Sequence, residues 1–230
     1  MSLKTLNKTQ KSAVEAIDGP VLIFAGAGSG KTRVLTHKIF YLVKEELFKP
    51  EEILAVTFTN KAAKEMENRV KKLLKTNALS LSIGTFHSIC AKILREDIKI
   101  LGFSRSFAIY DVKDQLDLIK VLFEQFDISK NIISPNQLRN QISLYKNKMI
   151  DCKTVKRKAR TKLEKTISDV YSQYQKSLKI NDALDFDDLL TFPLEIFRKK
   201  PTILKKYQNR WKYILVDEYK DTNRAQFKLL

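Results

Sequence analysis

This sequence is poor in cysteine, in acidic side chains and in long apolar runs. Its 230 residues contain two cysteines, Cys90 and Cys152, too few for a disulfide framework or a cysteine-rich metal cluster. We expect reduced thiols in a reducing compartment. No stretch approaches the roughly 20 apolar residues of a membrane-spanning helix, and the polar segment before Pro20 does not resemble a signal peptide. These absences predict a soluble, cytoplasmic protein.

Basic residues far outnumber acidic ones. The chain has 43 lysines and arginines against 26 aspartates and glutamates, for a formal net charge of +17. Such an excess is self-repelling unless a polyanion offsets it, and nucleic acid is the commonest polyanion. A general lysine-rich bias that serves only solubility explains the same charge. Composition therefore leaves nucleic-acid binding as one of two explanations.

Glycines are also few, but three of the six lie in one short segment. The apolar run Val21–Ala25, which we predict to be a buried strand, leads into that segment, and a helical pattern follows it. The glycines allow backbone N–H groups to turn toward an anion, and the helix adds its N-terminal amides. Lys31 would then reach the β- and γ-phosphates of a nucleotide, and the Thr32 hydroxyl would bind Mg²⁺. The alternative is a glycine-rich helix entry without a ligand. The predicted phosphate loop comprises Ala25, Gly26, Ala27, Gly28, Ser29, Gly30, Lys31 and Thr32.

An acidic pair, Asp217-Glu218, follows a second apolar run much later in the chain. In open parallel sheets, ligands bind beyond the carboxyl ends of strands, so this pair is predicted to lie beside the phosphate loop. Asp217 would bind Mg²⁺, and Glu218 would orient and deprotonate the attacking water. The alternative is an ordinary helix cap. We expect Glu218 and Lys31 to be the catalytic residues.

The order of the predicted elements favours an α/β fold. Strands are expected over 21–25, 53–58, 81–84 and 213–216, and helices over 10–17, 31–48 and 60–74. This alternation predicts a parallel sheet with helices on both faces. From about Ile89 to about Phe197 the pattern is mostly helical, with expected N-caps at Asp111, Ser134 and Asp185. We therefore predict a sheet domain formed by residues 1–90 and 198–230, with a helical insertion at residues 91–197.

Six short blocks follow one another along nearly the whole chain. They are Leu6–Gln10, Ala25–Thr32, Thr57–Ala63, Gly84–Ser88, Asp185–Leu190 and Asp217–Asn223. Each block is weakly informative by itself, but in this order they resemble the N-terminal part of a superfamily 1A DNA helicase of the UvrD/PcrA/Rep type. The resemblance implies a RecA-like P-loop NTPase sheet, incomplete at the C-terminus, and an inserted helical subdomain called 1B.

The resemblance also assigns roles to residues. Gln10 is expected to pair with adenine, because an amide offers both a donor and an acceptor, and Arg33 to line the nucleotide pocket. Two strand-end segments are expected to bind single-stranded DNA through hydroxyl, amide and aromatic groups. The alternative makes the phenylalanines core residues and the histidine a structural one. The DNA-binding candidates are Phe58, Thr59, Asn60, Thr85, Phe86 and His87.

The family further implies an ATP- and Mg²⁺-dependent helicase that moves 3′→5′ on single-stranded DNA, acts at junctions of single- and double-stranded DNA, and serves repair or replication. Its subdomain 1B contacts duplex DNA, which suits a cluster of basic residues; a solvated basic loop is the alternative. The cluster comprises Lys146, Lys148, Lys153, Lys156, Arg157, Lys158, Arg160, Lys162 and Lys165.

Two departures from the family pattern bear on activity. Lys220 stands where the family usually has a glutamine that senses the γ-phosphate, and the sequence stops at Leu230, before the second RecA-like domain. We therefore expect this chain alone to bind ATP weakly, to bind single-stranded DNA measurably and to hydrolyse ATP negligibly. The alternatives are the helicase subunit of a RecB/AddA-like nuclease and a DNA-binding module whose ATPase has decayed.

Overall fold

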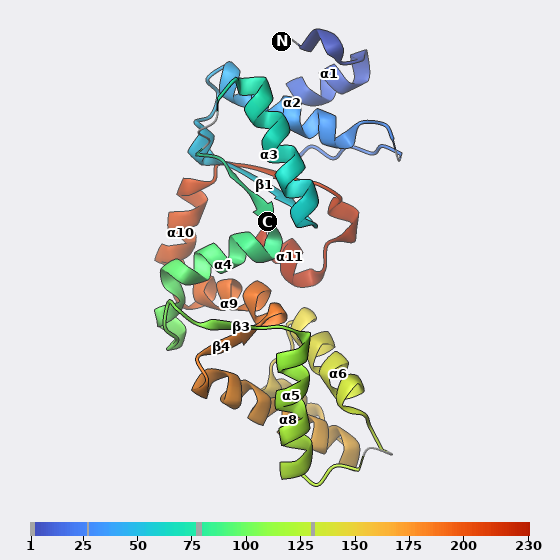
Figure 1. Ribbon diagram of the computed structural model, residues 1–230. Helices are drawn as coiled ribbons and strands as arrows, with labels where there is room; N and C mark the ends of the chain where they lie inside the picture. The colour runs from blue at the N-terminus through green and yellow to red at the C-terminus, as the bar shows by residue number, and fades with distance from the viewer. Residues whose placement is uncertain (1–2, 27, 77–79, 130–131) are drawn as a thin grey trace. The chain divides into compact units, whose positions relative to one another are not determined.

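The computed structural model describes residues 3–26, 28–76, 80–129 and 132–230, and these form two compact units (Figure 1). The first unit comprises Met1–Ile89 and Leu204–Asp221. The second comprises Cys90–Ile203 and Thr222–Leu230. Each unit therefore combines segments that are far apart in the sequence.

A parallel sheet forms the centre of the first unit. Its strand order is β2 (Ser82–Thr85), β1 (Ile53–Thr57), β5 (Tyr213–Val216), with β1 in the middle. All five residues of β1 are buried, as expected for a strand covered on both faces. The helices and 3₁₀ turns of this unit are η1 (Leu3–Thr5), α1 (Lys8–Glu15), α2 (Lys31–Lys44), η2 (Pro50–Glu52), α3 (Asn60–Leu74), the end of α10 (Pro201–Arg210) and η4 (Tyr219–Asp221).

Helices α2 and α3 pack side by side on this sheet. Their apolar residues recur at helical spacing, as with Leu35, Ile39 and Leu42 of α2, and meet the β1 side chains Ile53 and Ala55 in one core cluster. The predicted parallel sheet is thereby confirmed, and α3 has the predicted bounds.

The strand expected at Val21–Ala25 is wrong. Within the described residues, the sheet pairs β2, β1 and β5, and residues 20–26 are not part of any strand. Phe24 is 89% exposed and Leu22 is 59% exposed. An apolar run forms a strand when another strand accepts its backbone hydrogen bonds, and no strand does so here among the residues that the structure describes.

A buried lysine joins α1 to α2. The Nζ of Lys38, on α2, donates hydrogen bonds to the backbone oxygens of Ala13 and Ala16 at the end of α1. Burial lowers the pKa of Lys38. Because the last carbonyls of a helix have no partners within the helix, the lysine supplies donors that α1 otherwise lacks.

We expect Lys38→Met to lower the free energy of unfolding by about 1–3 kcal/mol, because two half-buried carbonyls lose their donor. The measurement is urea unfolding followed by circular dichroism. Lys44→Met, at the exposed end of the same helix, is the matched control and should change the midpoint little. Equal effects of the two substitutions would contradict this role of Lys38.

The second unit is mostly helical, as predicted, but it also contains a two-stranded parallel sheet that the sequence did not reveal. In this sheet β3 (Ala108–Tyr110) pairs with β4 (Ala183–Asp185). The predicted N-caps at Asp111, Ser134 and Asp185 all accept backbone N–H groups of the helices that they precede. The helices are α4 (Phe86–Asp97), which begins in the first unit, η3 (Ile98–Leu101), α5 (Val112–Gln125), α6 (Pro135–Asn147), α7 (Cys152–Lys158), α8 (Lys162–Ile180), α9 (Phe186–Lys199), the start of α10 and α11 (Arg224–Leu229).

One member of the predicted basic cluster is not at the surface. Lys146 is 3% exposed, and its Nζ lies 2.6 Å from an Asp185 carboxylate oxygen and 2.8 Å from one of Asp188. The hydroxyl of Tyr174 donates to Asp185 at 3.0 Å. The lysine is buried because of tertiary packing, in which α6 places it against the start of α9. Much of the remaining cluster lies on the short helix α7 and the first turn of α8 rather than in a loop.

Lys146, Asp185 and Asp188 form a buried ion cluster, and each charge shifts the pKa values of the others. Burial opposes the charge of Lys146, but the two carboxylates outweigh it and raise the lysine pKa. Burial also opposes the charge of Asp185, but the ammonium group outweighs it and lowers the pKa of that carboxyl. Burial and the neighbouring Asp185 raise the pKa of Asp188 to about 7. One cation thus serves two carboxylates.

Candidate nucleotide and nucleic-acid site

The predicted phosphate loop forms a turn that depends on glycine. Gly28 and Gly30 have φ angles of 75° and 87°, in the left-handed region that favours glycine. Gly30 is the N-cap of α2 and has no side chain to occupy the amides of its first turn. The helix therefore presents N–H groups and the positive end of its dipole to the loop. Ala27, one of the predicted loop residues, lies outside the described residues.

Lys31 connects the loop to the end of β5. Its Nζ donates to the backbone oxygens of Ala25 and Gly26, each at 3.2 Å, and lies 3.9 Å from the Glu218 carboxylate. The Ser29 hydroxyl also donates to Gly26 O, at 2.7 Å. The two halves predicted for a nucleotide site, although far apart in the sequence, are thus brought together within the first unit.

Glu218 has an unusual backbone. Its φ is 52°, a conformation that a residue with a side chain adopts at some cost. Among the described residues, the other non-glycine residues with positive φ follow the ends of helices, where such a turn is common, whereas Glu218 follows a strand. Strain of this kind is concentrated at functional sites, and here it sets the direction of the carboxylate after β5.

Asp217 is the buried member of the acidic pair, at 8% exposure. Burial, and then the neighbouring Glu218, raise its pKa. Its backbone N–H donates to Val56 O at 2.9 Å, which continues the β1–β5 pairing. Carboxylate and hydroxyl oxygens are the ligands that Mg²⁺ prefers. Asp217 and the half-buried Thr32 thus have the right donor chemistry to hold this ion.

Gln10 lies against the phosphate loop. Its amide nitrogen donates to Ser29 O at 3.0 Å, and its amide oxygen accepts from the Asn7 backbone in a capping box. A Cβ added at Gly30 would lie 3.1 Å from that amide nitrogen. The predicted adenine-binding residue and the loop are therefore in contact. The guanidinium of Arg33 donates a hydrogen bond to Thr5 O at 2.7 Å.

The strand-end segments lie along one edge of the sheet. The register aligns Thr57 with Thr85, and Val56 with Val216, so the carboxyl ends of β1, β2 and β5 share the edge that also bears Asp217. At this edge Thr59 caps α3 by accepting the Ala62 N–H.

The exposure of the DNA-binding candidates differs. Thr59 and Asn60 are exposed, and His87 is half-buried, with a pKa lowered by that burial. Phe86, by contrast, is 4% exposed and meets the Phe58 ring edge-on at 5.8 Å between centroids. We therefore assign Phe86 to packing rather than to base stacking, because a buried ring offers no free face.

One of the DNA-binding candidates, Thr85, and its partner in register, Thr57, have hydroxyl groups that already form hydrogen bonds. The Thr85 hydroxyl accepts the Ser88 backbone N–H, and the Thr57 hydroxyl donates to Thr59 O. Both threonines are buried. Their hydroxyls thus fix the turns at the strand ends, and Thr85 contributes local structure more than a free phosphate donor.

Comparison with known proteins identifies relatives over almost the whole chain. Residues 6–230 match the UvrD/REP helicase N-terminal domain family. The ATP-dependent DNA helicase PcrA of Bacillus subtilis (strain 168) is 46% identical over 228 residues, covering 99% of this chain and 31% of that protein. The protein of the same name from Staphylococcus aureus (strain Mu50 / ATCC 700699) is 44% identical with the same coverage. The chain thus spans about a third of the length of these relatives. Throughout the described ranges, no helix has the length and apolarity needed to cross a membrane.

Proposed function

Because this chain belongs to the UvrD/REP helicase N-terminal domain family, we propose that it forms the ATP-binding part, and part of the DNA-binding site, of an ATP-dependent 3′–5′ DNA helicase. The observation that carries the proposal is the 3.9 Å approach of Lys31 in the loop to Glu218 at the end of β5. A lysine that binds phosphates and a carboxylate that activates water are the two groups that nucleotide hydrolysis needs at one point. Its substrates are ATP and DNA, and its setting is DNA repair or replication in the cytoplasm.

Each residue of the site has a role in the proposed hydrolysis. The glycine-rich turn and the first amides of α2 bind the phosphates, and Lys31 offsets their charge. Gln10 recognises adenine, and Arg33 holds the N-terminal segment beside it. Thr32 and Asp217 would hold Mg²⁺, which would supply neutralisation of charge on the phosphates. Glu218 accepts the proton of the water whose oxygen attacks the γ-phosphorus, while the bond between that phosphorus and the ADP oxygen breaks.

The proposed DNA site uses the same sheet edge. The strands β1 and β2 end in register at Thr57 and Thr85. Thr59 and His87 each lie two residues beyond these ends, and Asn60 lies three residues beyond the end of β1. His87 is neutral near pH 7, because burial lowers its pKa, and it would bind DNA as a hydrogen-bonding group rather than as a cation. The proposed nucleotide site at the end of β5 is next to this edge, because β5 pairs directly with β1, so hydrolysis at one site would affect the other through these two strands.

The proposal extends to the domain organisation. Residues 1–90 and 198–230 would form a RecA-like domain 1A, and residues 91–197 the inserted subdomain 1B. The basic residues of α7 and the start of α8, without the buried Lys146, would contact duplex DNA ahead of a junction of single and double strands. The DNA helicase name of the relatives supports this assignment.

One contact favours a second candidate, a DNA-binding module with a decayed ATPase. Lys220 Nζ lies 3.9 Å from Glu218, so this carboxylate faces two lysines. An ammonium group cannot accept a hydrogen bond, so Lys220 cannot orient a water as a glutamine carbonyl would. A helicase subunit of a RecB/AddA-like nuclease has the same site, and a nuclease domain elsewhere in its protein would distinguish it.

We expect Asn60→Ala combined with His87→Ala to weaken binding of single-stranded DNA about 10- to 100-fold, because two phosphate or base contacts of about 0.7–1.4 kcal/mol each are lost. The measurement is fluorescence anisotropy of a labelled oligothymidylate. Asn209→Ala combined with His37→Ala removes the same side-chain types elsewhere in the first unit. If both double variants bound DNA like the unchanged chain, the proposed DNA edge would be wrong.

A further inference from the structure

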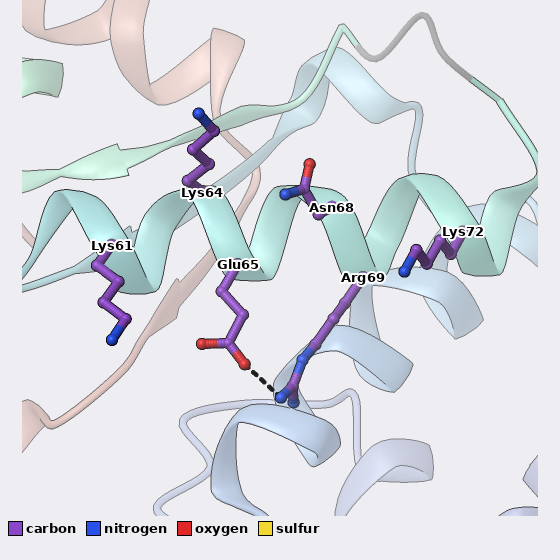
Figure 2. A pocket seen from close by; sticks show the side chains of 6 residues that line it. All are labelled: Lys61, Lys64, Glu65, Asn68, Arg69 and Lys72. Atoms are coloured by element: carbon purple, nitrogen blue, oxygen red, sulfur yellow. Dashed lines mark hydrogen bonds and ion pairs between the residues drawn. The ribbon is translucent and has the colours of Figure 1, made fainter.

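The outward face of α3 is strongly basic and hollowed. A shallow hollow of about 480 Å³ is lined by six residues that all belong to this helix. Figure 2 shows their side chains along successive turns, with Glu65 directed toward Arg69. All six are exposed. They are Lys61, Lys64, Glu65, Asn68, Arg69 and Lys72.

The cations of this face exceed its carboxylates. Glu65 forms an ion pair with Arg69, and the adjacent Glu67 pairs with Lys71. For Lys61, Lys64 and Lys72, the described part of the chain supplies no carboxylate partner within ion-pair distance. Exposed ion pairs along a helix stabilise it only weakly, and among the described residues these three lysines form none, so helix stability does not account for three further lysines on one face. Their charge is available to an anion.

The spacing of these lysines suits a chain of phosphates. At about 1.5 Å per residue, Lys61 and Lys72 are separated by about 16 Å along the helix axis. A nucleic-acid strand presents one phosphate every ~3.4 Å of axis in a duplex, and a similar or longer spacing when single and extended. Asn68 lies between Lys64 and Lys72 and offers an amide donor to the same row.

We propose that this face of α3 binds the phosphate backbone of single-stranded DNA as an extension of the proposed strand-end site. The inference rests on the proposed function, because it requires DNA at that edge. The helix begins at Asn60, one of the residues of the edge, and runs away from it, so a strand bound at Thr59 and Asn60 would continue onto the lysines. The block Thr57–Ala63, one of the six that resemble the helicase family, ends before most of this face.

The test is a triple substitution, Lys61→Gln, Lys64→Gln and Lys72→Gln, measured by anisotropy with a labelled oligothymidylate at several salt concentrations. We expect affinity at about 0.1 M salt to fall roughly 10-fold or more. The slope of log affinity against log salt should decrease in magnitude by about 2, because each lost phosphate contact removes about 0.7 on a single strand. The triple Arg variant at the same positions should retain affinity and slope, since it keeps the charge.

A matched control removes three exposed lysines elsewhere in the first unit, Lys44→Gln, Lys49→Gln and Lys205→Gln. Its net charge change is the same, so it measures the general effect of charge. If the α3 variant and this control had equal slopes while the unchanged chain bound DNA, the inference would be overturned and the proposed function would stand. If the unchanged chain bound no single-stranded DNA, the proposed function itself would fail. Thermal unfolding of each variant verifies that it is folded.

Discussion

Replacing Lys146 by methionine is expected to lower the free energy of unfolding by about 3–5 kcal/mol, because two buried carboxylates lose their cation. Lys146, Asp185 and Asp188 are each at most 3% exposed, so water cannot take the place of the ammonium group. The cluster joins α6 to β4 and α9, and its loss should loosen the core of the second unit. Urea unfolding followed by circular dichroism measures the change.

The matched control is Lys148→Met, two residues further along, whose side chain is exposed. We expect it to change stability by less than about 0.5 kcal/mol. Adding Asp188→Asn to Lys146→Met should restore part of the loss, because Asp188 carries the raised pKa of about 7 and is the carboxyl most easily replaced by a neutral group. If Lys146→Met and Lys148→Met had the same midpoint, the buried ion cluster would not stabilise the unit.

The second large effect concerns the nucleotide site. Lys31→Met is expected to weaken ATP binding by this chain about 10- to 100-fold, because a charge-assisted hydrogen bond to phosphate is worth about 1.5–3 kcal/mol. Glu218→Gln should leave binding within about threefold or strengthen it, since it removes a negative charge near the phosphates while preserving the side-chain shape. Equilibrium binding of a fluorescent ATP analogue separates the two results.

Hydrolysis distinguishes the proposed motor from a decayed ATPase. In a protein that joins this chain to a second motor domain, Glu218→Gln should lower kcat by about 10²–10⁴, the contribution of a positioned general base. Lys220→Gln should preserve or raise kcat, because it removes the second lysine facing Glu218. Glu51→Gln, at an exposed position of the first unit, is the charge control. An unchanged protein as slow as its Glu218→Gln variant would favour the decayed module.

Structural elements whose sequence pattern lies within a few neighbouring residues could be predicted. The caps at Asp111, Ser134 and Asp185 each bond to an N–H three residues ahead, so the sequence indicates them without knowledge of the fold. The strand β5 has the predicted bounds for a similar reason, because a short apolar run ends at an acidic pair. The glycine-dependent turn before α2 was predictable because its glycines, lysine and threonine are contiguous in the sequence.

Elements that depend on distant partners were not predictable in the same way. The strands β3 and β4 are three residues each and separated by more than seventy positions, so neither has a periodic signal of its own. The run Val21–Ala25 has the composition of a strand, yet strand structure requires a neighbouring edge and not composition alone. Lys38 and Lys146 are indistinguishable in sequence from the many exposed lysines around them.

The sequence by itself determined the parallel α/β class of the first unit, the starts of several helices and the family, because these depend on local periodicity, caps and contiguous blocks. It did not determine every helix end: the helices predicted over 10–17 and 31–48 are Lys8–Glu15 and Lys31–Lys44. The sequence also placed Glu218 beside the loop, but only the tertiary structure decided that its carboxylate lies 3.9 Å from Lys31. The tertiary structure alone decided that Phe86 packs inside, that Lys146 neutralises two carboxylates and that α3 has an unneutralised basic face. The physical reason is that the charge and burial of a side chain depend on what surrounds it in space, and those neighbours come from elements far away along the chain.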